Sequence, residues 1–394
     1  MELAKVILKS GKDISLRRKH PWVFSGAIKK ILGQPAEGDL VQVFDNKEEQ
    51  LATGHYQNGS IAIRVLSLGE EVIGDDFWKN KINNAWALRN EAGPANNDDT
   101  NVFRLVNAEG DGLPGLIIDY YNGTAVIQMH SLGMYRQLEN IKSALLEIEG
   151  LKIDTIYHKS SNTLPKRDGI EIIDEVIYGE REEGQVTEYG NTFSVNWRRG
   201  QKTGFFIDQR ENRKLLEYYS KGKNVLNMFC FSGGFSVYAI RGGAKLVHSV
   251  DSSVHAIDLT RENVKSNFPA CSIHEAFATD AFDYLQDIEN KYDLIILDPP
   301  AFAKHHNVLN NALQGYKRLN QKAMEQIRPG GILFTFSCSQ VVSKENFRKS
   351  VFAAAANSGR NVKILHQLTQ PVDHPVSIYH PEGEYLKGLV LKVD

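Results

Sequence analysis

The stretch 224–238, Asn-Val-Leu-Asn-Met-Phe-Cys-Phe-Ser-Gly-Gly-Phe-Ser-Val-Tyr, decides the expected fold. Its apolar run Val225–Phe229 predicts a strand, and the pattern becomes helical at Phe235 after a turn through Ser232–Gly234. A strand, a glycine turn and a helix in this order are typical of a nucleotide pocket at the carboxyl end of a parallel sheet. Glycines let a backbone approach a ligand closely, and the N–H groups at a helix start can bind an anion.

Four further apolar runs predict the other strands of this sheet. They are Leu246–Val250, Ser272–Ala276, Tyr292–Leu297 and Gly331–Ser337. Polar or reactive side chains follow these runs in order: Asp251, Asp280, Asp298 and Cys338. Because the carboxyl ends of parallel strands share one edge of a sheet, we expect these side chains to surround one ligand.

The ligand is predicted from what the turn contains and what it lacks. The turn has neither the G-x-G-x-x-G spacing of dinucleotide-binding folds nor the Walker phosphate loop. Asp251, about 20 residues past the turn, suits the hydroxyls of a ribose, and Asp280 can reach an adenine edge. Ribose and adenine contacts without a phosphate cradle indicate S-adenosylmethionine. The alternative is a doubly wound domain whose Gly and Asp residues only cap and turn.

The composition indicates an ordinary globular protein. The chain has 394 residues, 42% hydrophobic and 24% charged, which is enough for two or three domains. No apolar run reaches membrane-spanning length, and the first residues lack a signal-peptide pattern. Cys230, Cys271 and Cys338 are too few and too scattered for a disulfide framework or a zinc site. We therefore expect a cytoplasmic protein without metal or membrane contact. Its oligomeric state stays open, with a homodimer as one candidate.

Basic residues concentrate at the start of the chain. The net charge is −2, but residues 1–31 hold eight Lys or Arg against two acidic residues. A basic face on a nearly neutral protein indicates a nucleic-acid contact, and a solvated surface is the alternative. We expect Arg17, Arg18 and Lys19 to sit on RNA phosphates. Trp22 and Phe24, which follow them, are expected to pack in the core.

The pattern along the chain predicts three parts. Residues 1–72 read as short strands, and residues 73–188 as a central α+β domain with helices over 77–92 and 134–148. Residues 189–394 are expected to form the doubly wound domain. A hairpin over 189–206 precedes its sheet, and two antiparallel strands end it.

Several motifs resemble one family over the whole length. The chain is similar to the bacterial methyltransferases that make 5-methylcytosine in large-subunit ribosomal RNA and carry an N-terminal PUA domain. The resemblance implies a PUA-like β-barrel, a central α+β domain and a Rossmann-like class I methyltransferase domain. The motifs that carry it are Gln201–Arg210, Asp298–Phe302, Phe336–Ser339, Asp373–Pro375 and Pro381–Gly388.

The resemblance also completes the expected site. On sequence physics alone, residues 198–204 predict a hairpin linker before a helix cap at Asp208. The resemblance instead places Lys202 and Thr203 at the methionine or ribose end of the cofactor. The expected cofactor residues are Lys202, Thr203, Gln209, Phe229, Ser232, Gly233, Gly234, Asp251, Ser252, Asp280, Ala281 and Asp298.

Cys338 is the expected nucleophile. Cytosine C5 reacts poorly until a thiolate adds to C6, and this chemistry needs a cysteine at a strand end beside the cofactor. Cys338 ends the fifth predicted strand between Ser337 and Ser339, whereas a buried structural cysteine is the usual alternative. Asp298 is expected to hold the base edge and act as a general acid, and Phe302 to stack on the base. The base must leave its helical stack to enter.

Two questions stay open. The Asp298–Phe302 stretch lacks the second cysteine of many RNA cytosine-5 methyltransferases, so the base that removes the C5 proton is unassigned, with His374 and Lys304 as candidates. Other functions are also compatible with the chain. One is methylation of another base, such as guanine N7, which needs no thiolate. Another is an RNA-binding or ribosome-assembly factor with a relic methyltransferase domain.

Overall fold

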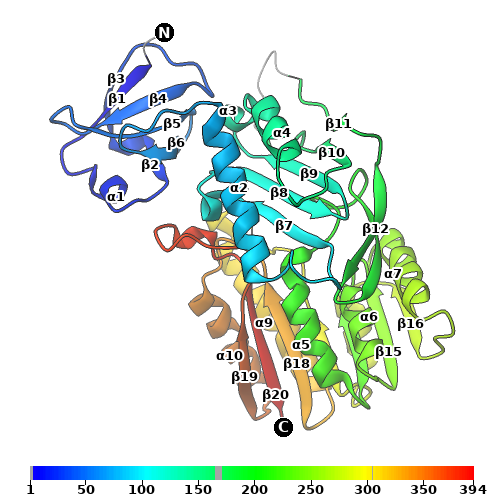
Figure 1. The fold of residues 1–394 in the computed structure, drawn as a ribbon. Coiled ribbons are helices and arrows are strands. Elements are labelled where there is room, and N and C mark those ends of the chain that lie inside the picture. Colours follow the sequence, from blue (N-terminus) through cyan, green and yellow to red (C-terminus); the bar gives the residue numbers. More distant parts are fainter. Residues whose placement is uncertain (1–2, 165–170, 304) are drawn as a thin grey trace. The chain divides into compact units, whose positions relative to one another are not determined.

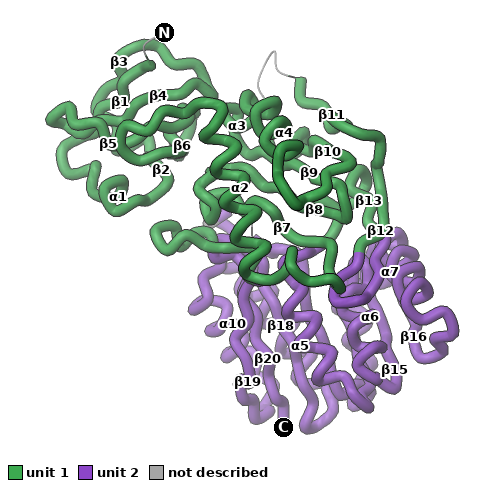
Figure 2. Tube along the Cα trace, in the orientation of Figure 1, with its two compact units in different colours: residues 1–186, 195–205, 372–383 green, residues 187–194, 206–371, 384–394 purple. Residues whose placement is uncertain are grey.

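The computed structural model describes residues 3–164, 171–303 and 305–394 (Figure 1). The chain forms two compact units, shown in different colours in Figure 2. Unit 1 comprises Met1–Val186, Val195–Phe205 and Val372–Gly383, and unit 2 comprises Thr187–Ser194, Phe206–Pro371 and Glu384–Asp394. Within the described ranges, no helix is both long enough and apolar enough to cross a bilayer.

Unit 1 begins with a six-stranded sheet in the order β2-β6-β5-β4-β1-β3. Buried apolar side chains such as Val6, Val41 and Ile63 form its core. Strand β1, next to the edge strand β3, runs parallel to β4 and antiparallel to β3. The elements are β1 (Ala4–Leu8), α1 (Ile14–Arg17), β2 (Trp22–Phe24), β3 (Ile28–Leu32), β4 (Leu40–Phe44), β5 (Gln50–Tyr56) and β6 (Ile61–Leu68).

A second sheet of unit 1 has the order β11-β10-β9-β8-β7 and packs in a second buried core, which Leu66 of β6 also joins. Phe77, Trp78 and Ile82 of α2 bury against this sheet with Ile141 and Leu145 of α4. The elements are α2 (Asp75–Ala92), β7 (Val102–Asn107), β8 (Leu116–Tyr121), β9 (Thr124–Met129), α3 (Leu132–Tyr135), α4 (Leu138–Leu146), β10 (Thr155–His158) and β11 (Glu175–Tyr178).

A buried polar cluster ties the segment Val372–Gly383 to the second sheet of unit 1. Arg89 is fully buried and forms two bonds, of 2.5 and 2.7 Å, to the Asp111 carboxylate. It also donates to the Asp373 carbonyl at 2.9 Å. Asn107 Nδ2 donates to the Pro375 carbonyl at 2.9 Å. A Cβ on Gly110 would lie 1.9 Å from that same carbonyl, so only glycine fits there.

The hairpin consists of β12 (Glu183–Glu188) and β13 (Asn191–Asn196). Within unit 2, Glu188 is completely buried and pairs with Arg213 at 2.6 and 2.8 Å. Thr192 N and Ser194 N donate to the side chains of Asn267 and Asn263, each at 2.8 Å. A buried pair of this kind is costly to break by removing one partner, so it fixes this part of the hairpin on α5.

Unit 2 is built on a seven-stranded sheet in the order β16-β15-β14-β17-β18-β20-β19. The first five of these strands are parallel, and β20 and β19 continue the sheet in antiparallel pairing. The strands are β14 (Asn224–Met228), β15 (Leu246–Asp251), β16 (His274–Ala278), β17 (Leu294–Leu297), β18 (Gly331–Ser337), β19 (Val362–Leu368) and β20 (Lys387–Val393). Strand order reverses between β14 and β17, the place where ligands bind in open α/β sheets.

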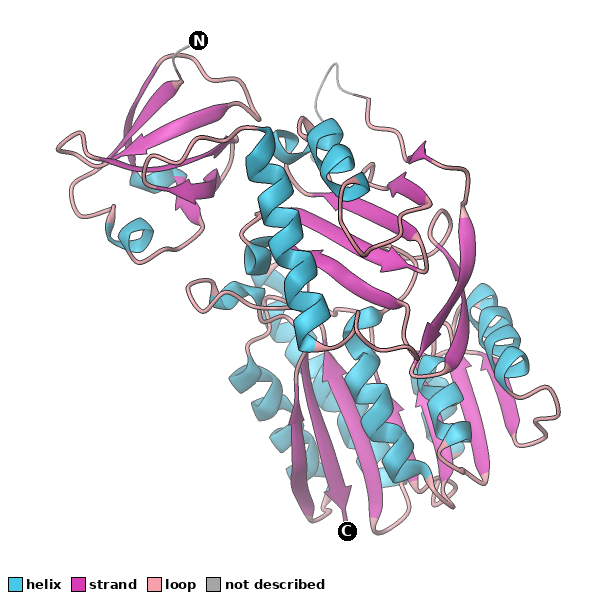
Figure 3. Cartoon of the chain, viewed as in Figure 1, coloured by secondary structure: helices cyan, strands magenta, loops and turns pink. Residues whose placement is uncertain are grey.

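Helices cover both faces of this sheet (Figure 3). Alternate residues of each strand enter different cores: Leu226, Ile295 and Leu333 face one, and Val225, Ile296 face the other. Because both faces are covered, the parallel strands read as continuous apolar runs. The helices are α5 (Arg210–Ser220), α6 (Gly234–Arg241), α7 (Val254–Asn267), α8 (Ala281–Tyr284), α9 (Leu309–Gln326) and α10 (Lys344–Ser358).

The observed architecture confirms the predicted mixed α/β class and doubly wound sheet, with three local corrections. The single helix predicted over 134–148 is two helices, because Ser131 caps α3 and a turn at Arg136 separates α4. The third parallel strand begins at His274 rather than Ser272, since its register is set by pairing of His274 with Val247. Residues 183–188, which precede the hairpin expected over 189–206, form strand β12.

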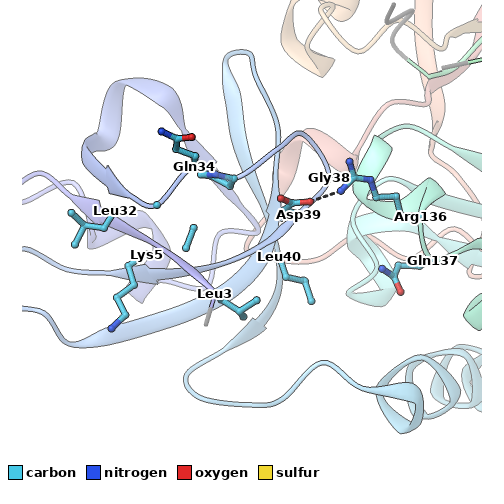
Figure 4. A pocket seen from close by; sticks show the side chains of 12 residues that line it. Leu3, Lys5, Leu32, Gln34, Gly38, Asp39, Leu40, Arg136 and Gln137 are labelled. Carbon is cyan, nitrogen blue, oxygen red and sulfur yellow. Dashed lines mark hydrogen bonds and ion pairs between the residues drawn. The ribbon is translucent and has the colours of Figure 1, made fainter. Parts of the chain in front are cut away.

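A surface cavity of about 830 Å³ lies in unit 1 (Figure 4). Leu3, Lys5 and Leu40 line it, together with Asp39 and Arg136, which form an ion pair there. None of the residues that line this cavity is among those predicted to bind the cofactor, RNA or the reacting base. It therefore gives no support to the predicted site.

Candidate active site at the carboxyl edge of the parallel sheet

The turn after β14 has an unusual backbone. Phe229 and Phe231 both have positive φ angles, 58° and 45°, although neither is glycine. Such conformations cost on the order of 1–3 kcal/mol each and persist only where the surroundings enforce them. Gly233 adds a φ of 75° at the residue before α6. Strained backbone at the end of the first parallel strand marks this turn as a ligand-binding candidate.

Neighbouring elements enforce that conformation. Phe231 N donates to Asp251 Oδ2 at 3.1 Å, and Thr260 Oγ1 of α7 donates to the Phe231 carbonyl at 2.9 Å. Asn263, one turn further along α7, donates from Nδ2 to the Ser232 carbonyl at 2.8 Å. Helix α7 thus binds two consecutive carbonyls of the turn, and these bonds fix the orientation of the turn's other backbone groups.

The two glycines serve packing. A Cβ on Gly233 would lie 2.7 Å from Thr260 Cγ2, and one on Gly234 would lie 2.9 Å from Arg213 Cδ. From the sequence, we expected these glycines to give room to a ligand. In the structure, the missing Cβ atoms let the turn settle on α7 and α5.

The carboxyl ends of β15 and β16 carry the two predicted acids. Asp251 ends β15 and is partly exposed, and its Oδ1 accepts from Ser253 N at 3.0 Å. Asp280 is the N-cap of α8 and accepts from Phe282 N at 2.7 Å. Ser252 is exposed and Ala281 is buried. The sheet register pairs Asp251 with Ala278, the last residue of β16, so Asp251 lies at a paired strand end and Asp280 lies two residues beyond it.

Asp298 follows β17 and has a partner from the region before α5. Gln209 Nε2 donates to Asp298 Oδ2 at 3.0 Å, and Gln209 Oε1 accepts from Asn212 Nδ2 at 2.6 Å. The Asn212 contact orients the Gln209 amide so that its N–H₂ group faces the carboxylate. Gln209 and Asp298, which the sequence placed together only through a motif resemblance, are therefore in direct contact.

Cys338 directly follows β18 and is partly buried. The next residue links its loop to the one that contains Asp298: Ser339 Oγ donates to the Ala303 carbonyl at 2.6 Å. On the other side, Ser337 Oγ donates to Tyr316 OH at 2.9 Å. Burial raises the pKa of Tyr316 to about 12, so its phenol stays neutral at physiological pH.

Phe302, in the loop after β17, packs against α9. Its ring lies 4.7 Å from the Tyr316 ring and packs against the core on that face of the sheet. A Cβ on Gly315 of α9 would lie 3.0 Å from Phe302 Cδ2, so this glycine makes room for the ring. Packing accounts for these contacts of Phe302, and stacking on a base remains a prediction.

The other two cysteines have separate environments. Cys230 is buried, and burial raises the pKa of its thiol to about 12. Its sulfur lies 3.5 Å from Thr260 Oγ1. Cys271 is a partly exposed free thiol near the start of β16. A thiol with a pKa near 12 is almost never a thiolate at neutral pH, so Cys230 is a packing residue of the turn.

Some predicted residues belong to unit 1. Thr203 is buried there, donating to Asp119 Oδ2 at 2.6 Å and accepting from Tyr121 OH at 2.9 Å. Lys202 is exposed and has a positive φ of 49°. His374 is completely buried beside Asp373, with Nδ1 3.2 Å from Oδ1. Lys304, the other candidate base, lies outside the described residues.

The three predicted RNA contacts also differ from one another. Arg17 pairs with Asp13, Asp45 and Glu49 at 2.7–2.9 Å. Arg18 is exposed beside a cavity of about 540 Å³ that Tyr379 also lines. The Lys19 ammonium lies 5.4 Å from the centre of the Tyr379 ring. A phosphate contact by Arg17 would require breaking its ion pairs, whereas Arg18 and Lys19 need no such change.

Sequence reasoning missed the supports of the site. The roles of Thr260, Asn263, Tyr316 and Ser339 depend on contacts between distant segments. Lys387 on β20 was also missed, although it lies in a motif that carried the family resemblance. A lysine in one of the two antiparallel strands expected at the end of the domain reads as an exposed residue, so the sequence alone contains no signal for its burial.

Comparison with known proteins decides the family. The sequence pattern of S-adenosylmethionine-dependent methyltransferases matches residues 113–378, and that of a PUA-like domain matches residues 6–68. The chain belongs to the S-adenosylmethionine-dependent methyltransferase family. The predicted cofactor is thereby confirmed, and so is the PUA-like N-terminal domain.

Relatives of this methyltransferase match it over nearly its whole length. A protein named ribosomal RNA large subunit methyltransferase I from Aeromonas hydrophila subsp. hydrophila is 39% identical over 99% of both chains. One of the same name from Pseudoalteromonas translucida is also 39% identical, over 98% of this chain and 99% of the relative.

Solved structures show the same fold. A chain described as a candidate SAM-dependent methyltransferase from Streptococcus mutans has a TM-score of 0.84 and 22% identity, covering 99% of this chain and 100% of that chain. A related methyltransferase, solved as a complex with SAH, has a TM-score of 0.85 and 23% identity over the same shares.

Proposed function

We propose that this methyltransferase methylates C5 of a cytosine in large-subunit ribosomal RNA, through a covalent bond between Cys338 and C6 of the base. The name of the full-length relatives supports the RNA class. The position of Cys338 supports the chemistry, because the Ser339–Ala303 hydrogen bond connects its loop to the one containing Asp298. That connection is the observation on which the proposal rests.

The proposed reaction balances as follows. The Cys338 thiolate adds to C6, and the ring electrons that this addition places at C5 form the new bond to the methyl group. The C5 proton then passes to a base, its bonding electrons reform the C5–C6 double bond, and the thiolate leaves C6. S-adenosylmethionine would supply the methyl group from its sulfonium sulfur, which keeps the electrons of the broken S–C bond and leaves as S-adenosylhomocysteine. Covalent catalysis of this kind divides one difficult step into easier ones.

Asp298 is proposed to bind the edge of the cytosine. A carboxyl group at N3 and N4 favours addition at C6, since protonating or hydrogen-bonding N3 makes the ring more electrophilic. The bond from Gln209 Nε2 to Oδ2 helps to fix the orientation of the Asp298 carboxyl group. The stiff Pro299–Pro300 sequence follows directly and limits movement of this loop.

The cofactor would be held around the ends of β14, β15 and β16. The turn through Phe229 has neither of the phosphate-binding motifs named above, and the partly exposed Asp251 carboxylate suits two ribose hydroxyls. We propose that cofactor contacts come from Phe229, Ser232, Gly233, Gly234, Asp251, Ser252, Asp280, Ala281, Asp298 and Gln209, with Lys202 and Thr203 included from the family resemblance. The free thiols at Cys271 and Cys338 suit action in a reducing cytoplasm.

A trapped adduct tests the chemistry. RNA that contains 5-fluorocytosine should form a denaturant-stable complex with the wild-type protein, because fluorine cannot leave C5 as a proton does. Cys338→Ala should form none, whereas Cys271→Ser, a change at the other partly exposed thiol, should form as much as wild type. Nucleoside mass spectrometry of the methylated RNA identifies the product. Methyl found on a ring nitrogen would exclude the proposal.

A charge-reversal pair tests the RNA contact. Arg18→Glu with Lys19→Glu should weaken RNA binding and reduce its dependence on salt, because each phosphate contact releases counterions. Arg17→Glu serves as the matched control, since Arg17 already has three carboxylate neighbours. Cofactor affinity should stay constant in both variants. An unchanged salt slope in the double variant would place the RNA contact elsewhere.

A further inference from the structure

Lys387 is a buried lysine beside the proposed nucleophile. It begins β20, is 3% exposed, and lies opposite Ser337 in the antiparallel register of β18 and β20. Cys338 is therefore the residue that follows its sheet partner. Lysine is almost never fully buried unless its charge has partners, so the position calls for a physical reason.

Its ammonium group holds the loop that follows β18. Lys387 Nζ donates to the Ser339 carbonyl at 2.6 Å and to the Val342 carbonyl at 2.8 Å. Val342 is fully buried, and its own N–H donates to the Ser339 carbonyl at 3.3 Å. The loop from Cys338 to Val342 thus closes around one cation. Because Ser339 also bonds to Ala303, the same cation indirectly fixes the proline loop after Asp298.

The charged groups around Lys387 indicate that its ammonium acts on Cys338. Burial lowers the pKa of Lys387 to about 8, and the negative charge of a Cys338 thiolate acts in the opposite direction. Lys344 lowers this pKa and Glu384 raises it, but these two form an ion pair of 2.5 Å with each other. On α9, Tyr316 has a pKa of about 12, raised mainly by burial, and is neutral. Cys338 is therefore the neighbouring group whose negative charge, as a thiolate, the Lys387 ammonium can balance.

We propose that Lys387 is a positioning residue for Cys338: its ammonium stabilises the thiolate and fixes the loop that presents it. This inference rests on the proposed function, which makes Cys338 the nucleophile. An ammonium has three N–H donors, and the two loop carbonyls accept from two of them. The third N–H can therefore donate to the Cys338 sulfur. An uncharged side chain of similar length could fill the same space, but it would supply no charge.

The reactivity of the thiol distinguishes this role from simple packing. Alkylation by iodoacetamide follows the thiolate fraction, and peptide mass spectrometry assigns the rate to each cysteine. In Lys387→Met, the rate at Cys338 at pH 7 should fall at least tenfold, and the pH of half-maximal rate should rise. Lys387→Arg, which keeps the charge, should restore part of the rate.

The control lies on the same strand. Lys392 also donates to a carbonyl, that of Gly330, from the other end of β20. Lys392→Met should leave alkylation at Cys338 unchanged. Kinetics should agree with the chemistry: Lys387→Met should lower kcat at least tenfold, while KM for S-adenosylmethionine changes less than twofold.

Wild-type protein provides a test that needs no variant. Cys338 should reach half-maximal alkylation at a lower pH than Cys271 in the same sample. Equal profiles, or a Lys387→Met profile identical to that of wild type, would overturn the inference. Failure of the proposed function looks different, because Cys338→Ala would then stay active whatever Lys387 does to thiol reactivity.

Discussion

Two turns at the carboxyl edge of the same sheet are held in opposite ways. The turn after β14 has strain in its own backbone, with positive φ angles at Phe229 and Phe231, and two side chains of one helix hold it. The loop after β18 has no residue with positive φ from Cys338 to Val342. It is held by Lys387 from β20 and by the Ala303 carbonyl beyond β17.

This difference suits the turn after β14 to binding the cofactor and the loop after β18 to the chemical step. A strained turn is pre-shaped, so a ligand need not pay for ordering it when it binds. A loop held by a charge places that charge beside the group that reacts. Changes at the first turn should therefore act mainly on cofactor affinity, and changes at the second mainly on the chemical step.

Cys338→Ala should give the largest effect, and it should lower turnover without changing cofactor binding. Turnover should fall by about 10³-fold or more, because a group acting in the covalent step is removed. The dissociation constant for S-adenosylmethionine, measured by calorimetry, should stay within twofold. If cofactor binding fell in parallel with turnover, the two turns would not be functionally separate.

Gly233→Ala should affect the first turn. The new Cβ would lie 2.7 Å from Thr260 Cγ2, and the residue would keep a φ near 75°. We expect a loss of about 2–3 kcal/mol in the free energy of unfolding, and weaker cofactor binding with it. Urea unfolding measures the first and calorimetry the second. Gly359→Ala provides a control, because Gly359 has a similar φ of 69° but nothing within 4 Å of its Cβ position.

Asp251→Ala should affect the same turn through a polar contact. It removes the acceptor of Phe231 N and the carboxylate proposed for the ribose. Cofactor affinity should fall by about 1–3 kcal/mol, the usual cost of an unmet hydrogen-bond set. At saturating cofactor, kcat should be close to that of wild type. A large loss in kcat with unchanged affinity would contradict the division between the turns.

Ser339→Ala should give the smallest effect and is confined to the second loop. It removes the 2.6 Å bond to the Ala303 carbonyl, worth about 1 kcal/mol. We expect kcat to fall about fivefold, with cofactor affinity unchanged, as measured by single-turnover kinetics. Ser343→Ala, at the N-cap of α10, is the control for loss of a serine hydroxyl nearby.

Sequence patterns predicted what local rules determine. Continuous apolar runs placed β14, β15, β17 and β18 within two residues, since buried parallel strands need such runs. The edge strand β16 was shifted by two residues, because its register depends on pairing with β15. The short strand β2, Trp22–Phe24, was missed, as three residues carry too little pattern to be recognised.

In the candidate site, too, local patterns predicted some residues, whereas others depend on contacts between distant segments. Asp251, Asp298 and Cys338 could be placed from strand ends, because the fold itself assembles that edge. Lys387 could not, since a lysine in a strand reads as an exposed residue until the antiparallel partner is known. The three carboxylates around Arg17 come from separate segments, so its local sequence looked simply basic.

The crossing of the chain between the two units bears on the order of events during synthesis. Unit 1 contains residues up to Val186 but also Val372–Gly383, so a ribosome must translate past residue 383 before that unit is complete. Until then Arg89 and Asn107 lack the Asp373 and Pro375 carbonyls that they bind in the finished protein. Vectorial, domain-by-domain folding is therefore blocked for unit 1. Nascent chains stopped before residue 372 carry an unfinished polar core, which is a feature that cellular quality control can act on.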